Sequence, residues 1–190
     1  MEQIFHYKGF VKRNEIIFKG DKEIENGFRY LLKIPLKNTG DQKVLVIMKN
    51  PSKANEHISD LTIDRVLTFC NNEGYSEVNI MNLYSYYSTD SNKIAELLKD
   101  GQEDIAVGID NDNIMKNLVQ EVDDVIVAWG SNTFGLTRQY KNRIKQVINI
   151  IKDKNLYYVE KNHGNGWYPR HAQVWSVKSG IKKYSWSLPR

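Results

Sequence analysis

A chain of 190 residues, 41% of them hydrophobic, can bury a core, which excludes general disorder and suits a single domain over residues 1–190. Its 27 basic and 23 acidic residues give a formal charge of +4, which permits nucleic-acid binding without requiring it. The only cysteine, Cys70, excludes an intramolecular disulfide and favours a reducing compartment. The longest strongly apolar run, Val44 to Met48, is too short to span a bilayer, and the N-terminus lacks a secretory pattern. We therefore expect a cytoplasmic protein with no membrane partner.

The N-terminal part of the chain favours β structure. Segments 4–11 and 15–19 flank a turn at 12–14, which predicts a hairpin, and a third apolar run spans 28–36. A cluster of turn-forming residues at 38–41 follows that run. We therefore expect an N-terminal β extension, a hairpin or meander, over residues 1–42.

From residue 43 onward, apolar runs alternate with amphipathic segments. The runs expected to form buried strands are 44–48, 78–83, 125–129 and 156–159. The segments expected to form helices begin at about 61, 113 and 137 and end near 73, 122 and 153, and a short helix capped by residues 89–91 ends at 98. This alternation predicts an α/β fold, a three-layer sandwich around a short, mainly four-stranded parallel sheet. That core spans 43–175, and residues 176–190 form a C-terminal tail.

Polar and aromatic residues gather where these strands end. Ligands of open parallel sheets bind beyond the carboxyl ends of the strands, so these residues are the candidate site. They are Asn50, Pro51, Ser52, Lys53 and Asp60 after the first strand, Asn82 and Tyr84 at the second, Trp129 and Ser131 at the third, and Arg170 and His171 after the fourth. Amides, hydroxyls, imidazoles and rings together can bind a flat, hydrogen-bonding ligand such as a nucleobase.

Other roles fit several of these residues. The Asn50-Pro51-Ser52 segment is also typical of a turn, and Asp60 is well placed as a helix N-cap. A histidine at position 171 also fits a surface role. Asn82 is the stronger candidate, because a polar amide inside an apolar strand must find partners or incur a burial penalty.

Charge and histidine patterns elsewhere carry less information. The segment 137–153 is expected to bury Tyr140, Ile144, Val147, Ile148 and Ile151 on one face. Its other face, typical of a solvated helix surface, carries Arg138, Lys141, Arg143, Lys145 and Lys152. The tail over 182–186 interleaves cations with aromatic rings, as nucleic-acid surfaces do and as an edge strand would. The histidines and acidic residues near 56–60 and 163–171 lack a recognised metal-ligand spacing, so we expect no metal and no cofactor.

Short segments spread in order along nearly the whole chain carry a first resemblance. They are Arg29-Tyr30-Leu31-Leu32, Asn50-Pro51-Ser52-Lys53-Ala54, Asp60-Leu61-Thr62-Ile63, Gly74-Tyr75, Asn82-Leu83, Thr89-Asp90, Asn111-Asp112, Ala128-Trp129-Gly130 and Pro169-Arg170-His171. In these the chain resembles a bacterial and phage family of unknown function, marked by an Asn-Pro-Ser-x-Ala segment after the first parallel strand. That resemblance implies no established activity.

A second, more distant resemblance rests on four landmarks in order. Asn50-Pro51, Asn82, the Trp-Gly-Ser segment at 129–131 and His171 are similar to motifs of the uracil-DNA glycosylase superfamily. The chain departs from that pattern at Met48, where a glycine is usual, and at Ala172-Gln173, where Pro-Ser is usual. No aromatic residue clearly matches the ring that stacks on the flipped base.

The superfamily resemblance implies a role for each landmark. Asn50 would position the attacking water, with Asp60 or another carboxylate helping, and His171 would stabilise the departing base. Asn82 would read the edge of the base, and Pro51, Ser52, Tyr84, Trp129 and Ser131 would surround the ligand. Phosphates would be held by Arg170, Lys53 and the basic face of 137–153.

Taken together, the sequence predicts a nucleobase-recognising protein whose partner is a nucleic acid or nucleotide. Hydrolysis of N-glycosidic bonds, as in DNA glycosylases, is the leading activity. Three alternatives remain open: a non-catalytic binder of a nucleotide or modified base with a phage or defence-related role, a different hydrolase, and a protein-interaction module on the same fold.

Overall fold

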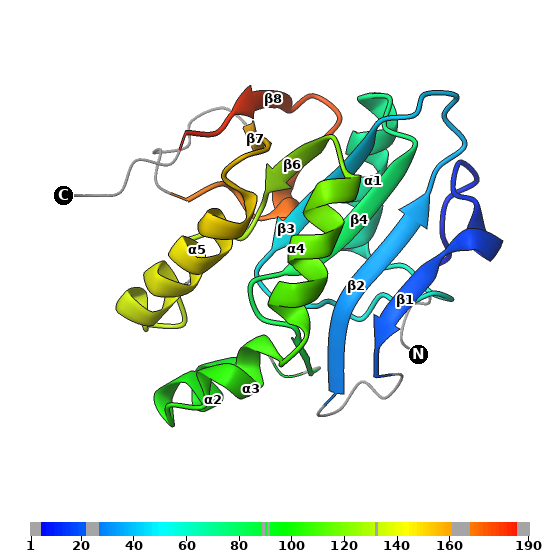
Figure 1. The fold of residues 1–190 in the computed structure, drawn as a ribbon. Helices are drawn as coiled ribbons and strands as arrows, with labels where there is room; N and C mark the ends of the chain where they lie inside the picture. Colours follow the sequence, from blue (N-terminus) through cyan, green and yellow to red (C-terminus); the bar gives the residue numbers. More distant parts are fainter. Residues whose placement is uncertain are drawn as a thin grey trace.

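The computed structural model is an α/β fold in which helices cover both faces of one eight-stranded mixed sheet (Figure 1). It describes residues 5–21, 27–88, 90, 92–131, 133–160 and 168–185. The α/β class predicted from the sequence is therefore confirmed. No helix in the described ranges combines the length and the apolar character needed to cross a membrane.

The sheet is larger than the predicted one and is not purely parallel. Its strands run in the order β1 (Ile17–Gly20), β2 (Gly27–Pro35), β4 (Glu77–Asn82), β3 (Lys43–Met48), β6 (Asp124–Val127), β7 (Asn155–Glu160) and β8 (Gly180–Lys183). Strands β4, β3, β6 and β7 pair in parallel, whereas β1, β2 and β8 join antiparallel at the flanks. A short strand, β5 (Tyr86–Tyr87), also pairs antiparallel with β2.

The position of β2 explains why the predicted sheet was too small. Leu32 and Ile34 have no exposed surface, so this strand is buried like the central ones. It lies between β1 and β4, with Leu32 opposite Ile80. The apolar run at 28–36 therefore extends the central sheet and does not form a separate N-terminal extension.

The hairpin expected over residues 4–19 does not form among the described residues. Residues Arg13–Glu15 form a short 3-10 helix, η1, and Val11 makes only an isolated bridge with Leu36. Tyr7 and Val11 are buried in the same core cluster as α1 (Leu61–Asn72). Burial of these side chains thus outweighs pairing between the two N-terminal segments.

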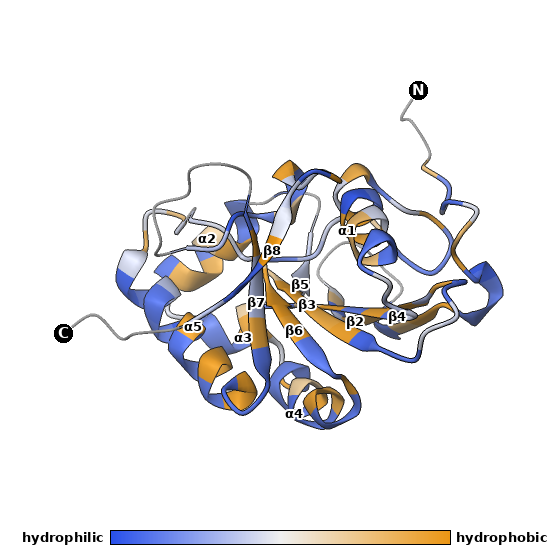
Figure 2. Ribbon diagram, turned by 90° about the horizontal axis from the view of Figure 1, so that it is seen from above, coloured by the Kyte–Doolittle hydropathy of each residue, from blue (hydrophilic) through white to orange (hydrophobic). Residues whose placement is uncertain are grey.

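The helices lie on the two sides of the sheet, as the edge-on view shows (Figure 2). Helix α1 packs on one face. The other face is covered by α4 (Asn111–Glu121) and α5 (Thr137–Ile151), beside α2 (Asn92–Lys99). A further short helix, α3 (Glu103–Val107), was not predicted, because its single turn has no amphipathic period to read.

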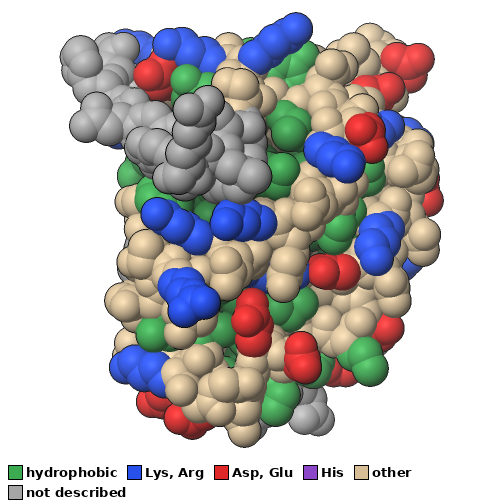
Figure 3. Space-filling model, turned by 60° about the vertical axis from the view of Figure 1, so that its left-hand side comes forward, with side chains coloured by type: hydrophobic (Ala, Val, Ile, Leu, Met, Phe, Trp, Pro, Cys, Tyr) green, Lys and Arg blue, Asp and Glu red, His purple; other side chains and the backbone are tan. Residues whose placement is uncertain are grey.

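Helix α5 confirms the predicted apolar face but corrects its basic one. Tyr140, Ile144 and Val147 are buried as expected from their helical spacing. Arg143, expected on the solvated face, is 1% exposed. Figure 3 shows one face of the molecule, on which several Lys and Arg side chains lie together and Asp and Glu side chains are interspersed among them.

Candidate functional site

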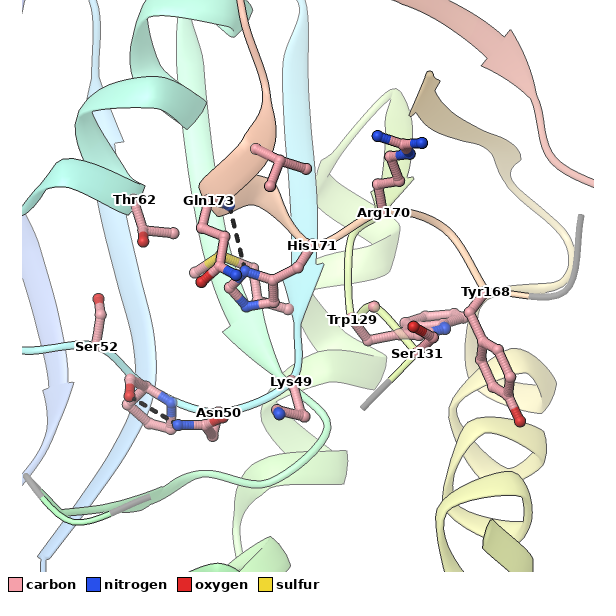
Figure 4. A pocket seen from close by; sticks show the side chains of 14 residues that line it. Lys49, Asn50, Ser52, Thr62, Trp129, Ser131, Tyr168, Arg170, His171 and Gln173 are labelled. Carbon is pink, nitrogen blue, oxygen red and sulfur yellow. Dashed lines mark hydrogen bonds between the residues drawn. The ribbon is translucent and has the colours of Figure 1, made fainter. Parts of the chain in front are cut away.

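A pocket of about 570 Å³ opens at the carboxyl ends of β3 and β6 (Figure 4). Three segments line it, together with Thr62 in the first turn of α1. They are Met48, Lys49, Asn50, Pro51 and Ser52 at and after the end of β3; Trp129, Gly130 and Ser131 after β6; and Tyr168, Arg170, His171, Gln173 and Val174 around the 3-10 helix η2 (Ala172–Val174). The pocket lies where the strand-end rule predicts a ligand site.

The segment that carries His171 is tied to the end of β6. The Gly130 amide donates to the Pro169 carbonyl at 2.9 Å. Gly130 has a φ of 73°, and a Cβ there would lie 3.1 Å from the His171 Cβ. A glycine therefore satisfies both the backbone conformation and the close approach that bring these segments together.

Seven of the eleven residues proposed from the sequence line this pocket. They are Asn50, Pro51, Ser52, Trp129, Ser131, Arg170 and His171. The structure places Lys53, Asp60, Asn82 and Tyr84 outside the lining. Asn132 and His163, which also follow predicted strands, lie outside the described residues.

His171 is a neutral hydrogen-bond donor at this site. Burial lowers its pKa to about 4 and the nearby Lys49 cation adds to that effect, while Asp60 acts in the opposite direction. The Nδ1 atom accepts from the Gln173 amide at 3.2 Å, so Nε2 carries the proton. Figure 4 shows the imidazole projecting into the pocket above Asn50.

Asn50 lies on the opposite wall. Its Nδ2 donates to the Pro51 carbonyl at 3.2 Å, a local bond that fixes the orientation of the amide. The Oδ1 atom is an acceptor and the second Nδ2 proton remains a donor, so the side chain offers two further polar functions to the pocket. The two residues that the resemblance pairs thus line one pocket.

Cations, and no carboxylates, line the described part of the pocket. Lys49 and Arg170 are its charged residues. Burial lowers the pKa of Lys49, and its Nζ lies 4.3 Å from the centroid of the Phe134 ring, a cation–π contact that holds the ammonium in place. The lining therefore has a positive potential that favours an anionic ligand.

Asp60, considered as a base from the sequence, is the N-cap of α1. Its Oδ1 accepts from the Thr62 and Ile63 amides at 2.8 and 2.9 Å, and Oδ2 accepts from the Ala54 amide at 3.2 Å. Both oxygens are thus engaged in holding the start of the helix and the loop before it. Its capping role, also foreseen from the sequence, accounts for its position.

Asn82 and Tyr84 are fully buried near the pocket. Asn82 pairs with Met48 in the parallel ladder, and neither its Oδ1 nor its Nδ2 has a partner among the described residues. The ring of Tyr84 stacks on Tyr140 with centroids 6.5 Å apart, and burial raises the pKa of its phenol. Lys53, by contrast, is exposed on the loop after β3.

Sequence reasoning missed several residues of the site. Lys49 directly precedes Asn50 and Gln173 lies two residues after His171, so the strand-end rule could have included both as candidate site residues. Arg29 on β2 is fully buried and bonds to Ser52, a lining residue. The signal was the same as for Asn82: a polar side chain within an otherwise apolar strand.

No group of three or more metal-ligating side chains occurs in the ranges that the structure describes.

The model of a family described as "Protein of unknown function (DUF1643)" matches residues 29–171. No curated protein and no solved structure matches the chain.

Proposed function

The chain belongs to this family of unknown function (DUF1643), and we propose from the pocket itself that it recognises a nucleobase carried by an anionic ligand, a nucleotide or a nucleic acid. One observation carries the proposal. The lining joins two cations, Lys49 and Arg170, to neutral hydrogen-bonding groups and contains no carboxylate among the described residues. A nucleotide presents the complement of that set, an anionic phosphate and a polar base edge.

The size and polar groups of the pocket support base recognition. A volume of about 570 Å³ falls within the range of small-molecule sites. The Asn50 amide offers a donor and an acceptor, which match the paired functions on a base edge, while His171 offers Nε2–H. The Tyr168 ring lies at the other end of the lining and can contact the base or sugar (Figure 4).

The state of His171 favours hydrolysis of an N-glycosidic bond as a second candidate. In this reaction, water adds to the sugar carbon as the bond to the base nitrogen breaks. The base leaves with the bonding electron pair, so negative charge develops on it, and the proton that the water loses passes to solvent and protonates the released base. A neutral imidazole with its proton on Nε2 can donate to a base carbonyl as that charge grows, which is the role that the glycosylase resemblance implies. Since no carboxylate lines the described pocket and Asn50 cannot act as a general base, we expect slow turnover.

A pair of assays tests both candidates. Isothermal titration with nucleosides and nucleotides measures binding, and base release from oligonucleotides carrying uracil, mismatches or modified bases is revealed by alkaline cleavage of abasic sites. Asn50→Ala and His171→Ala should weaken binding, and they should abolish any base release. Lys116→Met, on the exposed face of α4, is the control and should change neither. Absence of binding across the panel contradicts the proposal, whereas binding without release limits it to recognition.

A further inference from the structure

Arg29 is a fully buried cation without an ionic partner. It lies on β2 with 0% exposure, and no carboxylate in the described part of the chain forms an ion pair with it. Its Nε and Nη2 atoms also lack hydrogen-bond partners among these residues. Buried charges in proteins are normally paired, so an unpaired guanidinium needs an explanation.

The carboxylate of Asp60 compensates this charge only in part. Asp60 favours the charged form of Arg29, against the burial that lowers the pKa of the guanidinium. Its two oxygens, however, accept backbone amides at the start of α1 and in the preceding loop. They are therefore already satisfied and make no direct bond to Arg29.

The bonds that Arg29 does make run to the wall of the pocket. Its Nη1 donates to the Ser52 carbonyl at 3.2 Å, to the Ser52 Oγ at 3.3 Å and to the Ala54 carbonyl at 2.9 Å. The Tyr87 ring lies 5.9 Å from the guanidinium carbon, and its hydroxyl donates to the Lys53 carbonyl at 2.8 Å. Arg29 and Tyr87 together hold three consecutive residues of the loop after β3.

The bond to Ser52 has a chemical consequence. Because Ser52 Oγ accepts from Arg29, its own proton is available to donate, and no described residue accepts it. Ser52 lines the pocket, and its hydroxyl stands on the same side as that of Thr62 (Figure 4). A polarised hydroxyl backed by a buried cation is a good donor to an anionic oxygen.

We propose that Arg29 is a positioning residue that turns the Ser52 hydroxyl toward the pocket, and that the Ser52 end of the pocket binds the phosphate of the ligand. This inference rests on the proposed function and adds the place of the anionic group. The phosphate would accept a hydrogen bond from the Ser52 hydroxyl, which itself accepts from Arg29, and its negative charge would compensate the buried guanidinium. The same chemistry fits a nucleoside monophosphate and an internucleotide phosphodiester.

The test compares ligands with and without phosphate. Isothermal titration is run with nucleosides, their 5′-monophosphates and a short single-stranded oligonucleotide, on wild type, Ser52→Ala, Arg29→Met and the double variant. For wild type, a phosphate-bearing ligand should bind at least about tenfold more tightly than the nucleoside. Ser52→Ala should remove most of that advantage and leave nucleoside affinity unchanged. Preference for the monophosphate or the oligonucleotide identifies the source of the phosphate.

Two further readouts separate positioning from a general structural role. Because Arg29 acts through Ser52, the double variant should lose no more phosphate affinity than either single variant. Ser52→Thr, which retains the hydroxyl, should keep the affinity for phosphate that Ser52→Ala loses. Ser52→Ala keeps the test valid if Arg29→Met fails to fold.

The inference is overturned if nucleosides bind as tightly as their monophosphates, or if Ser52→Ala weakens both equally. In either case nucleosides still bind, so the proposed recognition of a base would stand and only the phosphate site would be rejected. If neither kind of ligand binds, it is the proposed function that fails. Lys116→Met controls for the loss of a surface cation and should not change the preference for phosphate.

Discussion

Two buried arginines, Arg143 and Arg29, differ in how completely the donors of the guanidinium are hydrogen-bonded. Arg143 on α5 donates from Nε to the Leu83 carbonyl at 2.7 Å and from Nη1 to Asp112 at 2.9 Å and Gln146 at 3.0 Å. Arg29 has only carbonyl and hydroxyl acceptors, and two of its nitrogens have no partner among the described residues. The fold can thus satisfy a buried guanidinium completely, and it does so for Arg143.

The two arginines also differ in the carboxylates that surround them. Arg143 borders a hollow of about 630 Å³ that is also lined by the carboxylates of Glu103, Asp104 and Asp112. Arg29 lies behind a pocket whose described lining contains no carboxylate. The arginine with a carboxylate partner thus lies among acids, whereas the arginine without one lies behind a cationic pocket, as its proposed role in anion binding requires.

The largest effect should come from breaking the paired arginine. Asp112→Ala leaves Arg143 buried without its carboxylate, and we expect the free energy of unfolding to fall by about 3 kcal/mol. This lies at the low end for a buried pair, because the Asp112 side chain is 34% exposed. Urea denaturation measures it, with Asp104→Ala, an exposed acid lining the same hollow, as control. A loss similar to that of the control would remove the contrast between the two arginines.

Protonation of His171 should destabilise the fold. Its pKa is about 4 in the folded protein, against an ordinary 6.5, so the unfolded chain binds more protons between these values. Its contribution to stability is therefore complete above pH 6.5 and is lost as the pH falls toward 4. The full shift in pKa corresponds to about 3 kcal/mol, and because the side chain is only half-buried we expect a loss of roughly 2 kcal/mol. His171→Gln should flatten this part of the curve in thermal melts recorded against pH. An unchanged slope in the variant would show that another group causes the pH dependence.

The sequence predicted the apolar faces of the helices and part of the pocket, but not the environments of the two arginines. Periodicity identified the apolar faces of α1 and α5, because burial follows helical spacing. The strand-end rule identified Asn50 and His171, which line one pocket although they are far apart in the chain. Both inferences depend on local pattern plus a general rule of α/β folds.

Neither rule could assign the long-range polar contacts. The pairing of Arg143 with Asp112 joins two helices, and Arg29 reaches the loop after β3 from a strand expected outside the central sheet. Such contacts depend on strand order and register, which the sequence does not encode locally. The burial of Arg143 was mispredicted for the same reason, since its partner lies on another element.

Replacing Arg29 should cost less stability than breaking the Arg143 pair. Arg29→Met removes a buried charge that lacks an ionic partner, but it leaves the Ser52 and Ala54 carbonyls without their donor. These effects oppose each other, so we expect a net change in the free energy of unfolding within about 1 kcal/mol. Inorganic phosphate should raise the Tm of the wild type and not that of the variant. A loss as large as that of Asp112→Ala would assign Arg29 a mainly structural role.

The smallest effect should come from the second support of the same loop. Tyr87→Phe removes the hydroxyl that donates to the Lys53 carbonyl but keeps the ring beside Arg29. We expect a loss of about 0.5–1 kcal/mol in the free energy of unfolding, because one neutral hydrogen bond is lost. Phosphate affinity should fall only slightly, since the Arg29 bond to Ser52 remains. Urea denaturation and titration with a nucleoside monophosphate measure the two effects. If Tyr87→Phe weakened phosphate binding as much as Ser52→Ala, loop position alone would account for the affinity, and the contribution of the buried charge would be excluded.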